Sequence, residues 1–140
     1  MLLFSKNKTR QLEVQRLLTK IINANNRSLD ALREGPRGEL RVDLALVVIV
    51  VPSIDDHPNR DLAFATVTRE VSSVGMSLVL SEKLDVSEVF LVLEVEREMK
   101  YVRAEVRHQG PLGAGLWQAG VQLTEIITPG DYPELKPLKI

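Results

Sequence analysis

The hydrophobic pattern changes character about a quarter of the way along the chain. In residues 9–25, TRQLEVQRLLTKIINAN, apolar side chains recur at helical spacing, and Leu12 lies off the stripe that they form. We therefore predict an amphipathic N-terminal helix, with another turn or two over SLDALREG before Gly35-Pro36 ends it. The stripe consists of Val14, Leu17, Leu18, Ile21, Ile22 and Ala24.

This apolar stripe has to be buried against something, because a continuous apolar face is not left open to water. The preferred interpretation is that it packs on the protein's own core, across one end of the fold. The alternative is that it pairs with a second copy of the chain.

From residue 40 onward the pattern is that of β-strands, with short apolar runs between turn residues. In KYVRAEVRH and LWQAGVQLT, apolar and polar residues alternate, so each strand has one dry and one wet face. SIDDHPN and GPLGAG are expected to be loops. Six strands with short connections predict a small antiparallel barrel or sandwich, because closure removes exposed edges. The predicted strands are 40–51, 61–70, 74–81, 88–98, 100–108 and 115–124.

Composition and charge narrow the class of protein. A chain of 140 residues with 44% hydrophobic and 26% charged residues is typical of one globular domain. The net charge of −1 argues against general attraction to nucleic acid or to an anionic membrane. Residues 1–41 carry nine Lys/Arg and four Asp/Glu, whereas residues 42–140 carry nine and fifteen. We therefore expect the first third of the chain to meet any bound anion.

Neither catalytic chemistry nor a membrane span is predicted. The chain has no cysteine, and its two histidines, His57 and His108, have no partner at a catalytic or metal-binding spacing. We therefore expect no enzyme, no metal and no cofactor. The apolar start MLLF is too short for a signal peptide, and Pro52 ends the longest apolar run at strand length, so a cytoplasmic location is expected. Scattered aromatics also disfavour a DNA- or RNA-binding barrel.

Two polar clusters interrupt the strand pattern. REGPRGELR places Arg33, Arg37 and Arg41 at intervals of four at the entrance to the first strand. EVSSVG, residues 70–75, separates two apolar strands. A guanidinium can bind a phosphate or the O6/N7 edge of guanine with two parallel hydrogen bonds. Taken singly, the arginines are typical of a solvated surface and the hexapeptide of a plain loop.

Together, the two clusters resemble the signature of the PilZ domain. That family carries RxxxR and then [Asp/Asn]xSxxG, and this chain has Arg37 and Arg41 followed by ExSxxG. The resemblance covers roughly residues 33–125 and includes QAGVQL, where Gln122 and Leu123 replace the family's Arg and Phe. It implies a six-stranded antiparallel PilZ-like β-barrel, so the expected fold is mostly β, with the amphipathic helix preceding the barrel. The expected division is a helical segment over 1–32, the barrel over 33–127, and a Pro-rich, loosely docked tail over 128–140.

PilZ domains are receptors for the bacterial second messenger cyclic di-GMP, and the resemblance implies the same ligand here. Arg37 and Arg41 would then hold phosphates and guanine edges, with help from Arg33. Ser72 would offer its hydroxyl to guanine or phosphate. Gly75 would let the backbone approach the ligand, because it has no Cβ.

Glu70 departs from the family pattern, since it stands where the family has Asp or Asn. It can accept the same guanine N–H bonds, but its extra methylene moves the carboxylate and adds a rotamer to be ordered. Two hypotheses follow. The chain is a cyclic di-GMP receptor that signals through protein contacts of its helix or tail, or through a homo-oligomer. Alternatively, it is a degenerate PilZ-like adaptor that binds proteins and no nucleotide.

Overall fold

The computed structural model describes residues 2–25, 32–34 and 40–138, with side chains over 8–24 and 41–138. Among these residues, one helix precedes a series of strands, and three short 3₁₀ turns lie between or after the strands. The helix is α1 (Leu2–Asn25); the strands are β1 (Leu32–Glu34), β2 (Leu40–Asp43), β3 (Val47–Ile54), β4 (His57–Pro58), β5 (Phe64–Ser72), β6 (Gly75–Leu80), β7 (Glu88–Val95), β8 (Glu98–Gly113) and β9 (Leu116–Ile127); the 3₁₀ turns are Arg60–Leu62, Pro129–Asp131 and Pro133–Leu135.

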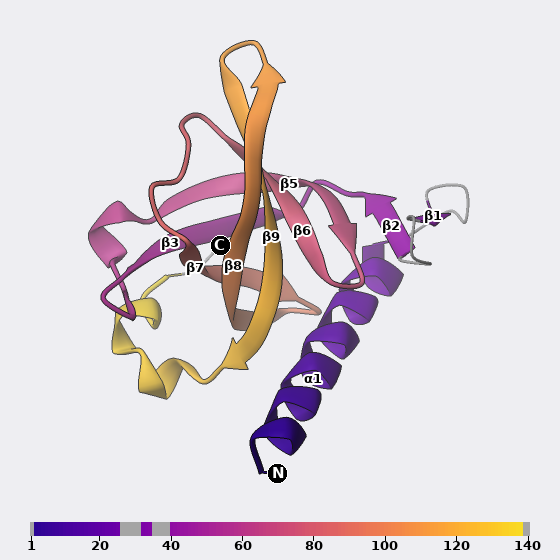
Figure 1. Ribbon diagram of the computed structural model, residues 1–140, viewed down its shortest axis with the longest axis vertical. Helices are drawn as coiled ribbons and strands as arrows, with labels where there is room; N and C mark the ends of the chain where they lie inside the picture. The colour runs from indigo at the N-terminus through magenta and orange to yellow at the C-terminus, as the bar shows by residue number, and fades with distance from the viewer. Residues whose placement is uncertain (1, 26–31, 35–39, 139–140) are drawn as a thin grey trace.

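Six of these strands close into an antiparallel barrel. The order β5-β6-β9-β8-β7-β3 returns to β5 through a β3–β5 pairing, which leaves no open edge between them (Figure 1). β1 and β2 extend the sheet beside β5, and β4 pairs with the end of β3. The predicted six-stranded antiparallel barrel with an N-terminal helix is confirmed.

The strands alternate as the sequence predicts, with one face in the barrel interior. β3 and β7 are exceptions, because they are buried on both faces. Val48 and Val50 of β3 face the interior, whereas Ile49 and Val51 belong to a second cluster outside the barrel. The continuous run VVIVVP is therefore apolar throughout because both sides of the strand exclude water.

The C-terminal tail covers this outer face, on the side of the barrel away from α1 (Figure 1). Leu135 is completely buried, and the Tyr132 ring packs against Phe90 with centroids 5.0 Å apart. The expectation of a loosely docked tail is therefore wrong for the described residues. The apolar outer faces of β3 and β7 need a cover, and the tail provides it.

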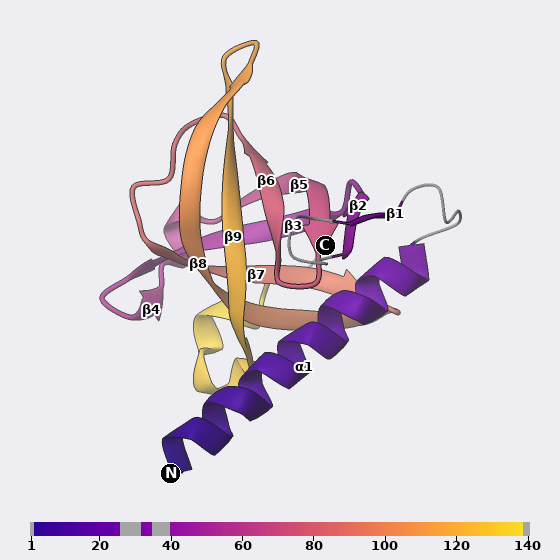
Figure 2. The same cartoon turned by 45° about the vertical axis from the view of Figure 1, so that its right-hand side comes forward.

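The helix crosses one end of the barrel, as Figure 2 shows. Its five large stripe residues are buried in the same cluster as the barrel interior, whereas Leu12 remains 51% exposed. Ion pairs from Arg10 to Glu125 (3.8 Å) and from Lys20 to Glu96 (3.4 Å) flank the contact. The stripe thus packs on the chain's own core, and self-association through it is not supported. No helix among the described residues is long and apolar enough to cross a membrane.

The predicted boundaries differ from the structure where pairing between strands outweighs local propensity. The helical turns expected over SLDALREG are wrong at Leu32–Glu34, which form β1 and pair with β2. The strand expected over 40–51 is divided into β2 and β3. GPLGAG is not a loop throughout, because β8 continues to Gly113 and the β8–β9 hairpin extends beyond the barrel (Figure 1).

Candidate functional site

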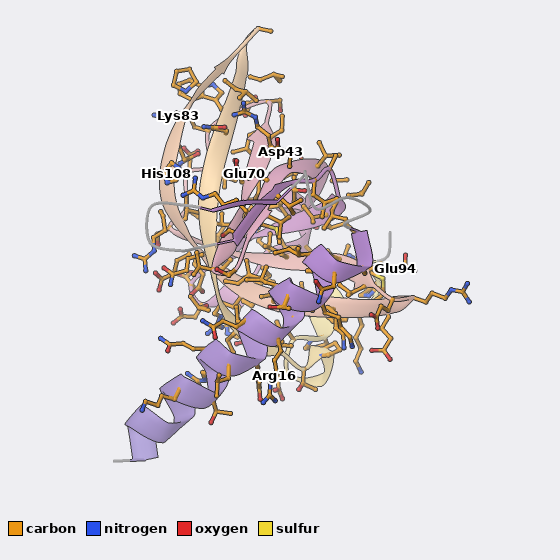
Figure 3. All side chains as sticks on the ribbon, turned by 90° about the vertical axis from the view of Figure 1, so that its right-hand side faces the viewer. Arg16, Asp43, Glu70, Lys83, Glu94 and His108 are labelled. Carbon is orange, nitrogen blue, oxygen red and sulfur yellow. The ribbon has the colours of Figure 1, made fainter. Side chains whose placement is uncertain are left out.

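A groove of about 440 Å³ lies on the outer face of the barrel, where β2, β5, β6, β9 and β8 run side by side. Figure 3 shows Glu70 and His108, two of the residues that line it, on the same side of the barrel. The lining residues are Arg41, Arg69, Glu70, Ser72, Val74, Gly75, Met76, Ser77, Arg107, His108, Gln118, Gly120, Val121 and Gln122.

Arg41 and Glu70 meet because β2 pairs with the end of β5. The register sets Arg41 opposite Ser72, and the Arg41 Nη1 atom lies 3.8 Å from Glu70 Oε1. Their side chains are 39% and 32% exposed, so the ion pair is open to water on one side. A pair of this kind contributes little to stability and can rearrange toward a ligand.

Thr68 fixes the position of β2. Its hydroxyl accepts a hydrogen bond from the Leu46 N–H (2.9 Å) and donates one to the Leu44 carbonyl (2.5 Å). Among the described residues it is the one buried polar side chain. These two bonds provide partners for the backbone N–H of Leu46 and the carbonyl of Leu44, in the segment between β2 and β3 where strand pairing is interrupted. They therefore hold β2, and Arg41 with it, beside the end of β5.

Ser72 and Gly75 have structural roles in the turn between β5 and β6. The Ser72 hydroxyl accepts from the Val74 N–H (3.3 Å) and the Gly75 N–H (3.2 Å), which closes the turn. A Cβ on Gly75 would lie 2.0 Å from the Val121 carbonyl oxygen, so Gly75 lets β6 approach β9 closely. Both residues line the groove, but the turn and the sheet already account for the serine and the glycine.

Two β-bulges bring further arginines to the groove. The β5–β6 register shifts between Thr68 and Glu70, and the β8–β9 register shifts between Val106 and His108. The extra residue is an arginine in each case, Arg69 and Arg107. A bulge breaks the alternation of faces, so Arg69 and Glu70, and likewise Arg107 and His108, line the same groove.

The outward-facing residues of β9 anchor these arginines. Gln118 accepts a hydrogen bond from Arg69 Nη1 (2.8 Å), and Gln122 accepts one from Arg107 Nε (2.7 Å). Arg107 also lies 3.2 Å from Glu105. The two glutamines restrict the guanidinium groups to the walls of the groove while leaving both arginine side chains exposed.

The structure brings together four of the six residues that the sequence singles out: Arg41, Glu70, Ser72 and Gly75. Arg33 lies opposite Arg41 in the β1–β2 register, but its side chain is outside the described part of the chain. Arg37 falls outside the described residues altogether.

Sequence reasoning missed Arg69, Arg107, Gln118 and Gln122 as groove residues. The alternation in KYVRAEVRH and LWQAGVQLT predicts that Arg107, Gln118 and Gln122 point outward from their strands. Neither β-bulge, however, can be predicted from the sequence. Arg69 and Arg107 lie beyond the first third of the chain, the part that was expected to meet any bound anion.

The arrangement is suited to binding an anion that also carries hydrogen-bond donors. Arg41, Arg69 and Arg107 contribute guanidinium groups from three strands, and Glu70 contributes one acceptor. Among the described residues, no group of three or more His, Asp or Glu side chains could hold a metal ion.

Comparison with families of proteins and with curated sequences gives no match. Among solved structures, the chain is similar to the Bacillus subtilis inhibitor of motility (MotI/DgrA), with 18% identity and a TM-score of 0.51 over 74% of this chain and 49% of that one. It is also similar to the PilZ domain of CeSA from a cellulose-synthesizing bacterium, with 17% identity and a TM-score of 0.43 over 69% and 90% of the two chains. The chain therefore spans about half the length of the MotI/DgrA structure. The likeness to MotI/DgrA is one of fold, in agreement with the PilZ-like barrel predicted from the sequence.

Proposed function

We propose that this chain is a cyclic di-GMP receptor that passes the signal on through protein contacts. The observation that carries the proposal is the convergence of Arg41 and Glu70, which are distant in sequence, on one groove that also receives Arg69 and Arg107. The groove volume of about 440 Å³ falls in the range of small-molecule sites. Cyclic di-GMP has two phosphates and two guanines, so it presents anions and N–H donors together.

In this proposal the residues of the two sequence motifs have defined roles. Arg41, with Arg37 and Arg33, binds phosphate oxygens and the guanine O6/N7 edge. Glu70 accepts from the N–H groups of a guanine, so its carboxylate leaves the 3.8 Å contact with Arg41 when ligand binds. Ser72 and Gly75 act by holding the turn that carries these groups.

Two strands connect the groove to the N-terminal helix. β5 and β9 bear groove residues on their outer faces, and both strands contact α1. A ligand that tightens β2, β5 and β9 can therefore change how the helix presents its exposed face to a protein partner. A cytoplasmic location is part of the proposal, because the messenger acts there.

The alternative is a PilZ-like adaptor that has lost its nucleotide. The Arg41–Glu70 ion pair favours this alternative. The Glu70 side chain is longer than the family's Asp or Asn, and its carboxylate competes with a phosphate for the Arg41 guanidinium. Under this alternative, Arg69 and Arg107 contribute to a protein-binding surface.

Calorimetric titration with cyclic di-GMP distinguishes the two functions when it is applied to the wild type, Glu70→Asp and Glu70→Ala, with GTP as the control ligand. If the chain is a receptor, the wild-type protein binds cyclic di-GMP, and Glu70→Asp binds it equally tightly or more tightly. Glu70→Ala loses about 1–3 kcal/mol of binding free energy. Binding that appears only in Glu70→Asp identifies the degenerate adaptor. Absence of binding in all three proteins overturns the ligand assignment.

A further inference from the structure

His108 takes no part in the function proposed so far, yet its position in the groove is unusual. It lies directly opposite Gly120 in the β8–β9 register, beside the bulge at Arg107. A Cβ built on Gly120 would lie 2.2 Å from His108 Cε1 and 2.8 Å from both ring nitrogens. The imidazole therefore occupies the space that a side chain at position 120 would fill.

The three distances also give the orientation of the ring. If the Cε1 edge pointed straight at Gly120, both nitrogens would lie clearly farther away than Cε1. Both are only slightly farther, and equally so, which means that the ring lies across the glycine with one face turned toward the strand. His108 is exposed and lines the groove, so its other face is open to the groove.

Two glutamines and two arginines lie near the His108 ring. Gln118 and Gln122 flank Gly120 on the outer face of β9, and they hold Arg69 and Arg107 on either side of the imidazole. A flat ring between two guanidinium groups offers stacking for a planar base and charge for its phosphates. Of the described aromatic and histidine side chains, His108 is the one that lines this groove.

We propose that His108, seated on Gly120, is a stacking platform for a purine base of the bound nucleotide, and that Arg69 and Arg107 receive its phosphates. The inference rests on the proposed nucleotide-binding function and adds base-stacking and phosphate-binding residues that the sequence motif does not contain. The competing structural role is that the ring only shields the backbone at Gly120.

Proton NMR of the histidine rings tests the stacking directly, because the chain has only two histidines. His57 is on β4, outside the groove, and serves as an internal control. On titration with cyclic di-GMP, stacking moves the His108 ring proton upfield and leaves His57 in place. Cyclic di-AMP and GMP serve as further purine probes, and inorganic phosphate as a probe without a base.

Four variants separate a platform from a shield, with affinity measured by calorimetry and folding by thermal unfolding. His108→Ala is expected to lose about 5- to 150-fold in affinity, the range for one stacked base, whereas His108→Phe keeps a flat ring and keeps the affinity. Gly120→Ala displaces the ring without removing any groove side chain, so it is expected to weaken binding like His108→Ala. Gly110→Ala is the matched control: a Cβ on this glycine of β8 would meet no atom within 4 Å, so the variant is expected to bind like wild type.

The outcomes distinguish this inference from the proposed function. If cyclic di-GMP binds, but His108 shifts no more than His57 and His108→Ala binds like wild type, the platform is overturned and the receptor function stands. If only cyclic di-AMP or GMP binds and moves the His108 signal, the platform stands and the ligand assignment is overturned. If no nucleotide binds or moves either signal, both are overturned.

Discussion

The two outer faces of the barrel use arginine in opposite ways. On the face covered by the tail, Arg103 lies over the rings of Phe90 (5.2 Å) and Tyr132 (5.5 Å), donates to the Tyr132 hydroxyl and lies 3.6 Å from Glu88. On the groove face, Arg69 and Arg107 are exposed and held by glutamines on β9. The first arginine is enclosed by aromatic and acidic partners from its own chain, whereas the other two remain accessible to a ligand.

This difference separates stability from binding. Aromatic rings and a buried leucine fill the tail face, so substitutions there are expected to lower the free energy of unfolding. The charged side chains of the groove face are solvated, so substitutions of these charged residues are expected to change affinity and leave the fold intact.

The largest effect is expected for Leu135→Ala on the tail face. Leu135 is fully buried, so truncation should lower the free energy of unfolding by about 2–5 kcal/mol in urea denaturation. Affinity for cyclic di-GMP should not change. Leu12→Ala is the matched control, because Leu12 is 51% exposed and its truncation should cost less than about 0.5 kcal/mol. Equal losses for the two variants would show that the tail does not cover the barrel.

Arg41→Ala should have the next largest effect, on binding. Loss of charge-assisted hydrogen bonds should weaken cyclic di-GMP binding by about 1.5–3 kcal/mol in calorimetry, with unfolding unchanged. Arg41→Lys should recover little, because an ammonium group cannot form the same paired bonds. Arg60→Ala, an exposed arginine outside the groove, should bind like wild type. Undiminished affinity in a folded Arg41→Ala protein would remove Arg41 from the site.

The smallest effect is expected for Arg103→Ala. It should lower the free energy of unfolding by about 1–2 kcal/mol, because the cation–π contacts with two rings are lost. Tyr132→Phe removes only the hydroxyl and should cost less than Arg103→Ala. A loss of nucleotide affinity in Arg103→Ala without a loss of stability would contradict the separation of the two faces.

The alternation in strands such as KYVRAEVRH predicted an antiparallel barrel or sandwich, and the resemblance to the PilZ signature selected the six-stranded barrel. The helix was predicted because Val14, Leu17 and Ile21 share one face. The sequence did not predict the tail contact: Tyr132, Leu135 and Leu138 recur every three residues and pack in one cluster, but prolines interrupt the segment and no helical or strand period marks it as docked. β1 was also missed, because its structure depends on pairing with β2 rather than on local preference.

Only the residues of the candidate site that belong to short sequence motifs were predicted. Arg41 and Glu70 could be singled out because each belongs to a motif with fixed spacing. Arg69 and Arg107 could not, because a bulge arises from the register between two strands. His108 could be judged only once Gly120 was known to lie opposite it.

A map of backbone amide NMR shifts, recorded while the unmodified chain is titrated with cyclic di-GMP, tests most directly whether the groove is the nucleotide site. We predict saturable changes at Glu70, Ser72 and Gly120 on the groove face, and none at Phe90 or Tyr132 on the tail face. GTP at the same concentrations should not reproduce the pattern. Changes confined to the tail face, or no changes with cyclic di-GMP, would contradict the assignment of the groove as the nucleotide site.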